Sequence, residues 1–277
     1  MESSGIDKDI DRPDRAEQAA SLPRRVDVGG CRIDPLDMGQ TLDRCEQLIE
    51  SRGITQHVAI NAAKIIAMRS DPLLRDVIGG CELVSADGQS VVWASRLLGD
   101  PLPTRVAGID LMQELLALGE RKGYSVYFLG AKKEVLDRAL ERIGRRHPGL
   151  EIAGARDGYF GDDEGQQVAD AIREAAPDIL FVAISSPKKE HWLGHYGREI
   201  DVPFVMGVGG SVDVLAGLTR RAPRILQRAG LEWAYRLAQE PRRLMRRYLT
   251  TNAKFIALVL RQRVAGRPGR HGDGGGG

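Results

Sequence analysis

Short apolar runs alternate with helix-like segments along most of the chain. The apolar runs are four to six residues long and end close to Gly, Asn, Ser or Asp. Continuous apolar runs of this length are typical of strands that are buried on both faces of a parallel sheet. We therefore predict strands over residues 57–61, 83–86, 125–129, 152–155, 179–184 and 204–208.

The segments between these runs carry apolar residues at helical spacing. Predicted helices cover residues 42–51, 62–77, 90–98, 109–122, 133–147, 163–175 and 188–197. Regular alternation of strands and helices indicates an α/β fold, a Rossmann-like parallel sheet flanked by helices.

The pattern changes after Val208, where a basic helical appendage is predicted. One helix starts at Ala222-Pro223, and Pro241 is placed to begin a second helix, which is amphipathic over 242–263. Between residues 220 and 263, twelve Lys and Arg face two Glu, so this segment carries +10 in a chain of net charge +2. Such asymmetry suggests an anionic partner: lipid headgroups, a diphosphate or nucleic acid. The alternative is a terminal helix that docks on the core with solvated arginines.

These patterns divide the chain into four parts. We expect a disordered arm over 1–24, an α/β core over 25–218, the basic appendage over 219–264 and a disordered Gly-rich tail over 265–277. The arm lacks the apolar stretch of a signal peptide, and no apolar run approaches the ~20 residues of a membrane span.

The overall composition is that of an ordinary globular protein, with 42% hydrophobic and 28% charged residues. The three cysteines lack a C-x-x-C spacing, which argues against a disulfide framework and against a zinc knuckle. A cytoplasmic location follows as an expectation.

Ligands of parallel α/β sheets bind at the carboxyl ends of the strands, so the residues there are the candidates for chemistry. Asp87 could act as a general base, although Asp87-Gly88 taken alone favours a simple turn. Gly207-Val208-Gly209-Gly210 could admit phosphates to the backbone, or form only a tight turn. It matches neither the dinucleotide fingerprint nor a P-loop.

Two other patterns fail as sites. His191 and His195 could face one metal ion, but no third ligand is evident. Ser185 and Ser186 lack the G-x-S-x-G setting of a hydrolase nucleophile.

An ordered set of motifs is more specific than any of these elements alone. In chain order they are N-A (61–62), A-D-G (86–88), R-V-A-G-I-D-L (105–111), F-L-G (128–130), G-Y-F (158–160), P-K-K-E (187–190), G-V-G-G-S-V-D (207–213), R-A-P (221–223), L-E-W-x-Y-R (231–236) and E-P-x-R (240–243). Over residues 26–263 the chain resembles the WecG/TagA/CpsF family of bacterial glycosyltransferases.

This resemblance implies an inverting transfer of an N-acetylmannosamine-type sugar from a UDP-sugar, without a metal or other cofactor. The acceptor would be a sugar on a polyprenyl diphosphate, and the product would feed cell-surface polysaccharide or teichoic acid synthesis. The enzyme would sit peripherally on the cytoplasmic face of the membrane. Nucleic acid is not an expected partner, and the sequence leaves open whether the chain forms a homo-oligomer.

The resemblance also implies roles for particular residues. Asp87 matches the general base, and Asn61 and Arg105 match polar residues of the same pocket. The appendage arginines Arg236, Arg243 and Arg246 match groups expected to meet diphosphate, a role that suits a planar, permanently charged guanidinium. For contacts to donor or acceptor we select Lys189, Gly209, Gly210 and Asp213.

Two positions depart from the family pattern. Ala59 stands where the family usually has threonine, and Lys189 replaces a neutral amide. The added cation suggests an altered donor or acceptor, such as an acidic sugar paired with Lys189; lost activity is the other reading. From other protein classes, a non-catalytic nucleotide-sugar-binding or scaffold protein and a Rossmann oxidoreductase are the alternatives, and the missing dinucleotide fingerprint disfavours the second.

Overall fold

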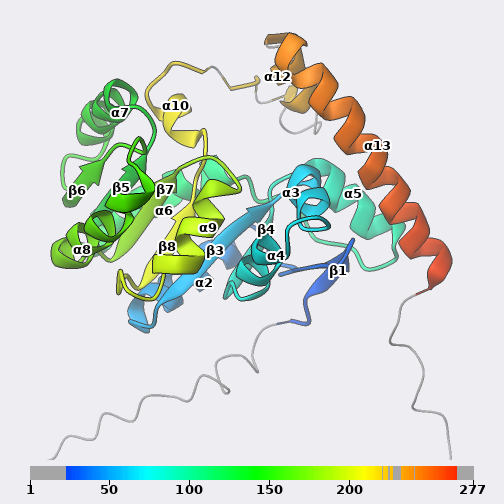
Figure 1. The fold of residues 1–277 in the computed structure, drawn as a ribbon, viewed down its shortest axis with the longest axis horizontal. Helices are drawn as coiled ribbons and strands as arrows, with labels where there is room; N and C mark the ends of the chain where they lie inside the picture. Colours follow the sequence, from blue (N-terminus) through cyan, green and yellow to red (C-terminus); the bar gives the residue numbers. More distant parts are fainter. Residues whose placement is uncertain (1–22, 220, 224, 227–231, 240, 267–277) are drawn as a thin grey trace, which may run out of the picture.

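The centre of the protein is a parallel sheet of six strands, in the order β4-β3-β8-β7-β5-β6 (Figure 1). The structure, a computed structural model, describes residues 23–219, 221–223, 225–226, 232–239 and 241–266. The strands are β3 (Thr55–Ile60), β4 (Leu83–Ala86), β5 (Val126–Gly130), β6 (Ile152–Arg156), β7 (Ile179–Ala183) and β8 (Phe204–Gly207). All neighbouring strands pair in parallel, which confirms the predicted α/β fold and its six apolar runs as strands.

A small antiparallel hairpin precedes the sheet. It consists of β1 (Val26–Val28) and β2 (Cys31–Ile33). The turn residues Gly29 and Gly30 have φ of +66° and +84°, a conformation that suits glycine and matches the twist of a tight hairpin. This hairpin was not predicted from the sequence, because strands of three residues are too short for an alternation of apolar and polar residues to be recognised.

Helices cover both faces of the sheet, as its continuous apolar strands require. The helices of the described residues are α2 (Met38–Glu50), α3 (Ala62–Ala67), α4 (Pro72–Gly79), α5 (Gln89–Leu97), α6 (Gly108–Lys122), α7 (Lys133–Arg146), α8 (Gly165–Ala175), α9 (Lys188–Tyr196), α10 (Ser211–Leu215) and the appendage helices α12 (Glu232–Gln239) and α13 (Pro241–Ala265). Along β5, Val126 and Phe128 pack with α2, α6 and α7, whereas Tyr127 and Leu129 pack with α8 and α9.

Three predicted helices differ from the observed ones by more than one residue. The helix predicted over 42–51 begins earlier, at Met38, because Asp37 caps it. The segment 62–77 is not one helix but two, because Asp71-Pro72 interrupts it. Pro72 has no N–H to continue α3, while the Asp71 side chain accepts a hydrogen bond from Leu74 N (2.9 Å) and caps α4. The helix predicted over 163–175 begins with a 3-10 turn, Asp162–Glu164, before α8.

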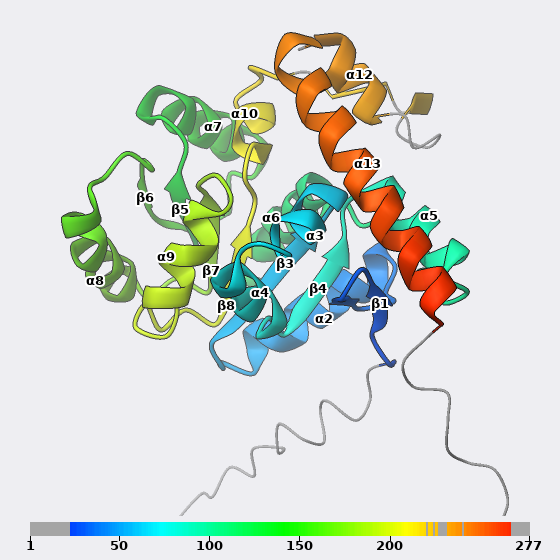
Figure 2. The same cartoon turned by 45° about the vertical axis from the view of Figure 1, so that its right-hand side comes forward.

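The C-terminal helix α13 lies along one side of the core, next to α3 and α5 (Figures 1 and 2). Phe255 and Val259 are buried in the cluster that also contains β1, β2 and α3. The second appendage helix is therefore confirmed and docks on the core. Of the first predicted appendage helix, residues 227–231 lie outside the described residues, as do the arm 1–22 and the tail from 267. Among the residues that the structure describes, none of the helices is long and apolar enough to cross a bilayer.

Candidate functional site

The carboxyl ends of β3 and β4 bring Asn61 and Asp87 to one place. The backbone N–H of Asp87 donates to Ile60 O (2.8 Å), which extends the pairing of the two strands beyond their ends. Asn61 caps α3 by accepting a hydrogen bond from Lys64 N (3.1 Å). A Cβ atom on Gly88 would lie 3.3 Å from Asn61 Cβ, so the two loops are in contact.

The Asp87 carboxylate points at the first turn of α6. Its Oδ1 accepts a hydrogen bond from Gly108 N (3.1 Å), and the partial positive charge of the helix N-terminus stabilises the carboxylate. Among the described residues, none donates a hydrogen bond to Oδ2. Asp87 is half-buried, so one oxygen is oriented by the fold and the other can accept a proton from a bound hydroxyl.

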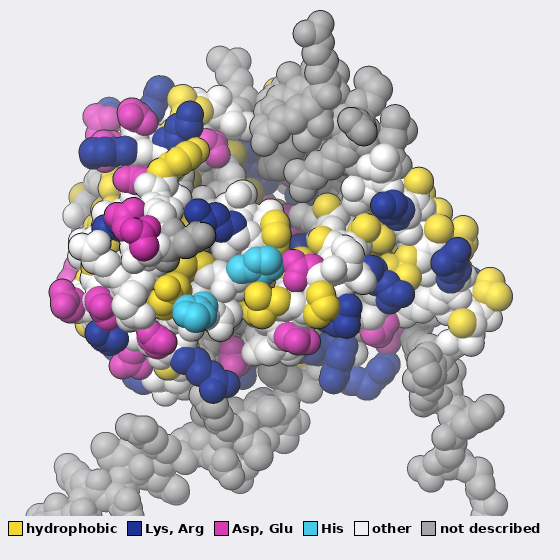
Figure 3. All heavy atoms as spheres, viewed as in Figure 1, with side chains coloured by type: hydrophobic (Ala, Val, Ile, Leu, Met, Phe, Trp, Pro, Cys, Tyr) yellow, Lys and Arg dark blue, Asp and Glu magenta, His cyan; other side chains and the backbone are white. Residues whose placement is uncertain are grey.

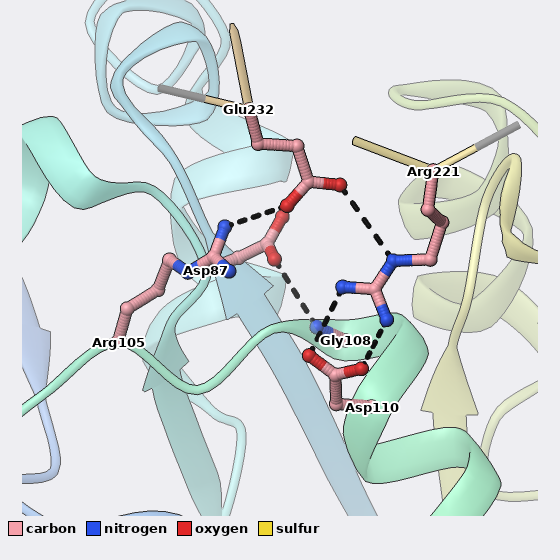
Figure 4. A network of polar contacts seen from close by, with 6 residues as sticks. All are labelled: Asp87, Arg105, Gly108, Asp110, Arg221 and Glu232. Carbon is pink, nitrogen blue, oxygen red and sulfur yellow. Dashed lines mark hydrogen bonds and ion pairs between the residues drawn. The ribbon is translucent and has the colours of Figure 1, made fainter. Parts of the chain in front are cut away.

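Around Asp87 a chain of charged side chains joins four segments of the protein (Figure 4). Arg105 Nη1 donates to Glu232 Oε2 (2.9 Å). The other oxygen of Glu232 lies 3.8 Å from Arg221 Nε. Arg221 in turn forms a bidentate pair with Asp110 on α6, with Nη2 3.1 Å from Oδ2. Because Glu232 belongs to α12, this chain attaches the appendage to the core beside the candidate base.

The electrostatics of this chain keep Arg221 charged. Burial by itself lowers the pKa of Arg221, but the hydrogen bond and charge of Asp110, together with the charges of Glu232 and Asp87, raise it overall. The influence of Asp87 means that the guanidinium and the candidate base act on each other. A fixed positive charge beside a carboxylate suits the binding of an anionic group near a reacting hydroxyl.

The structure therefore brings Asn61, Asp87 and Arg105 into one region, and their roles stay predictions. Gly209 and Gly210 form the loop after β8, and Asp213 lies in the first turn of α10. This loop is at the same edge of the sheet, because β8 is the neighbour of β3. Gly209 has a φ of +50°, so the turn itself favours glycine there.

Arg236 falls within α12, and Arg243 and Arg246 fall within α13. Their side chains lie outside the described part of the structure, so the predicted contact with diphosphate stays a prediction.

Lys189 lies in a buried cluster and not on an open pocket wall. Lys189 is 4% exposed, and its Nζ lies 3.2 Å from Glu190 Oε1. Lys64 Nζ is also 3.2 Å from Glu190 Oε1 and donates to Ala59 O (3.1 Å). Two ammonium groups thus share one carboxylate beneath the site, and a Cβ on Gly207 would meet Lys189 Cε at 2.5 Å.

This crowding of charge changes the ionisation of the cluster. Burial and the nearby Lys64 lower the pKa of Lys189 to about 8, although Glu190 opposes the shift. Burial also lowers the pKa of His57, on β3, to about 3, with smaller contributions from the two lysines. His57 is therefore neutral near pH 7 and hydrogen-bonds to Ser85 Oγ (2.8 Å).

The pKa of Lys189 predicts how stability depends on pH. Between about 8 and the ordinary value of 10.5, the unfolded chain holds this proton and the folded chain does not. Unfolding then takes up a proton, so the free energy of unfolding contributed by Lys189 rises with pH over that interval. Urea unfolding from about pH 7 to 10 should show this rise in the wild type and its loss in Lys189→Gln. The exposed neighbour Lys188→Gln is the control and should keep the rise; a rise of equal size in both variants contradicts the prediction.

Asp110, Arg221 and Glu232 were missed as site residues, although each belongs to a motif noted in the sequence. Arg105 and Glu232 are separated by 127 positions, and Asp110 and Arg221 by 111. No spacing rule connects residues so far apart. The available signal was that each of the three is a charged residue within one of the family motifs.

The histidine pair has a simpler explanation than a metal. His191 Nε2 lies 2.9 Å from Asp71 Oδ2, so His191 links α9 to the cap of α4. The three cysteines are free and buried, as the absence of disulfide spacing predicted.

Comparison with known proteins identifies one family and two similar proteins. The family described as "Glycosyl transferase WecG/TagA/CpsF family" matches residues 26–269. A protein of Bacillus spizizenii (strain W23), named N-acetylglucosaminyldiphosphoundecaprenol N-acetyl-beta-D-mannosaminyltransferase, is 38% identical over 198 residues, which are 72% of this chain and 76% of that protein. A protein of the same name from Bacillus subtilis (strain 168) is 36% identical over 187 residues, 68% of this chain and 72% of its own length.

Proposed function

The chain belongs to the WecG/TagA/CpsF family of glycosyltransferases, and we propose that it transfers N-acetylmannosamine from a UDP-sugar donor to a lipid-linked sugar. The acceptor would be N-acetylglucosamine on a polyprenyl diphosphate, the compound in the names of its Bacillus relatives. The product would enter cell-surface polysaccharide or teichoic acid synthesis.

The observation that carries this proposal is the setting of Asp87. One carboxylate oxygen is held by Gly108 N, and the other has no hydrogen-bond donor among the described residues. In the proposed step, Asp87 takes the proton of the acceptor hydroxyl, and the hydroxyl oxygen attacks the anomeric carbon. The bond from that carbon to the UDP oxygen breaks, UDP leaves with the electron pair, and the configuration at the carbon inverts.

Positive charge on the departing diphosphate is the second requirement of this reaction. Arg105 and Arg221 both adjoin Glu232 next to Asp87, and in this proposal their guanidinium groups supply part of that charge. We propose that Arg236, Arg243 and Arg246 complete this positive environment. These arginines would supply charge stabilisation that needs neither a metal ion nor another cofactor.

The position of Lys189 bears on the choice of donor. An acidic sugar paired with Lys189 would need an exposed ammonium, but this ammonium is buried against Glu190. We therefore favour the neutral N-acetylmannosamine over its uronic acid. Lys189 and Lys64 leave one net positive charge behind the loop at Gly207, which favours binding of the diphosphate common to both donors.

An assay of UDP release tests the proposal. The purified full chain is given UDP-N-acetylmannosamine, its uronic acid or UDP-N-acetylglucosamine, each with and without the N-acetylglucosaminyl polyprenyl diphosphate. We expect release with the first donor only when the acceptor is present, and a disaccharide lipid as product. Release that ignores the acceptor, or no transfer from any of the donors, contradicts the proposal.

We further propose that the enzyme works on the inner face of the membrane, where a lipid-linked acceptor is held. Beside the basic side chains of α13 (Figure 3), Ile256, Leu260 and Val264 form an exposed apolar stripe at four-residue intervals, and Leu260 is 50% exposed. Trp93 and Leu97 form a second exposed stripe on α5. The two helices meet where the Arg263 guanidinium donates to Leu97 O. Apolar stripes flanked by cations are typical of surfaces that lie in a bilayer interface.

Replacing Ile256 and Leu260 with serine is expected to weaken vesicle binding by about tenfold or more, since each side chain loses ~1 kcal/mol or more of apolar burial. Co-sedimentation with vesicles that contain anionic lipid measures this, and high salt should weaken wild-type binding as well. Leu73→Ser removes an equally exposed leucine from α4 and is the control. Binding that is indifferent to both salt and the double substitution contradicts the membrane proposal.

A further inference from the structure

A second cationic surface lies on α7, apart from the residues around Asp87. Arg138, Arg142 and Arg146 follow one another at four-residue intervals, so their side chains share one face of the helix. Like charges at this spacing destabilise a helix by ~0.2–0.5 kcal/mol per pair. We therefore expect a group of opposite charge to offset the repulsion among these three arginines.

Carboxylates within the described part of the chain do not provide that compensation. No ion pair joins Arg138, Arg142 or Arg146 to any described residue. The remaining cations of α7 are both paired along the helix, Lys133 with Asp137 (2.9 Å) and Arg145 with Glu141 (2.5 Å). Arg146 lies in the last turn of α7, where the helix dipole favours a positive charge. Arg138 and Arg142 lie further from the end of the helix and do not gain this interaction.

The stripe lines a cavity of about 520 Å³ between α6, α7 and α10. Its charged lining consists of Arg138, Arg142, Arg145 and Arg146 with one acid, Glu141, which pairs with Arg145. Its apolar lining comes from Leu116, Ile143, Val214 and Leu215. Small-molecule sites in proteins have volumes of ~300–1,000 Å³ and combine an apolar lining with a few polar groups. An apolar floor with three guanidinium groups fits a ligand with one flat, weakly polar part and one strongly anionic part.

The cavity adjoins the candidate active site through two elements. Gln113 lines the cavity one turn after Asp110, the partner of Arg221. Arg142 lies against the backbone where α10 ends, since a Cβ on Gly217 would collide with its guanidinium. The other end of α10 follows directly on Gly210. A ligand held by Arg142 would thus contact the helix that carries the glycine loop (Figures 1 and 2).

We infer that this cavity is a second binding site for a diphosphate group, with a nucleoside diphosphate as the ligand that fills it. The arginine stripe binds the diphosphate, and the apolar lining receives the base. The nucleotide part of this inference rests on the proposed function, because UDP is the product that the transfer would release. Its occupancy would link product concentration to the position of α10.

Isothermal titration calorimetry of the full chain, with UDP and with inorganic pyrophosphate as ligands, tests the inference. We expect the wild type to bind two equivalents of UDP. The variant Arg138→Ala/Arg146→Ala should retain one equivalent and bind at the other site at least about tenfold more weakly, because charge-assisted hydrogen bonds are lost. Arg121→Ala/Arg198→Ala removes the same charge from exposed positions outside the cavity and should bind like the wild type.

The remaining outcomes are decisive too. Pyrophosphate binding that the stripe variant loses, without a second equivalent of UDP, supports the diphosphate site and assigns it to inorganic diphosphate. One equivalent of UDP with identical affinity in all variants, and no pyrophosphate binding at the stripe, overturns the inference. Loss of all UDP binding in the stripe variant also overturns it, since the cavity would then be the donor site. Sugar transfer is measured separately, so its absence alongside stripe-dependent binding refutes only the proposed function.

Discussion

Replacement of Asp87 by asparagine is expected to lower the rate of sugar transfer by about 10²- to 10⁴-fold, the usual contribution of a general base. Asparagine keeps the size of the side chain and can still accept the hydrogen bond from Gly108 N. It cannot take the proton of the acceptor hydroxyl. UDP release with the lipid-linked acceptor measures the loss, mainly as a fall in kcat.

The same variant separates the transferase from a non-catalytic binding protein. We expect the Asp87→Asn variant to keep UDP affinity and thermal stability close to those of the wild type. Asp43→Asn, which removes an exposed carboxylate from α2, is the matched control and should remain fully active. Wild-type activity in the Asp87→Asn variant would remove Asp87 from the mechanism.

The second large effect is expected from Glu232. Glu232→Ala removes the carboxylate that adjoins both Arg105 and Arg221, and Glu232 is only 8% exposed. Truncating one partner of a largely buried charge pair costs about 2–5 kcal/mol, much of it because the other charge is left unpaired. We expect kcat/KM to fall by about 100-fold, because Arg105 loses the partner that orients it and α12 loses an ion pair with the core.

A double-mutant cycle shows whether this loss comes from the pair. If Arg105 and Glu232 act together, the effects of Arg105→Ala and Glu232→Ala on kcat/KM will be strongly non-additive. The exposed pair of Arg24 and Asp100 is the control, and its coupling should stay below about 1 kcal/mol. Additive effects at Arg105 and Glu232 would mean that the contact in Figure 4 does not contribute to catalysis.

The parallel sheet was predictable because its signal is local. Each buried strand is a continuous apolar run, such as Ile179–Ala183, and each run ends at a loop residue that marks the edge of the sheet. The order of the strands could not be read in the same way. It places β8 between β3 and β7, and this arrangement depends on which hydrophobic faces the helices cover.

The position of Asp87 was equally predictable, since it directly follows β4. Its surroundings were not. The contact with Gly108 N and the proximity of Glu232 arise from chain segments that are 21 and more than 100 positions away. For Lys189 the local prediction was wrong. Its position after β7 suggested that it lines a pocket, but contacts with Glu190 and Gly207 hold its side chain in a buried cluster.

Local sequence patterns were sufficient to predict the α/β class, the strands, the basic character of the C-terminal segment and the candidate base at a strand end. These properties follow from hydrophobic periodicity, charge and turn residues over a few neighbouring positions. The position of Glu232 between Arg105 and Arg221, the burial of Lys189 and the arginine-lined cavity between α7 and α10 became visible in the folded protein alone. Such contacts depend on packing between distant segments, and no local pattern encodes which side chains that packing brings together.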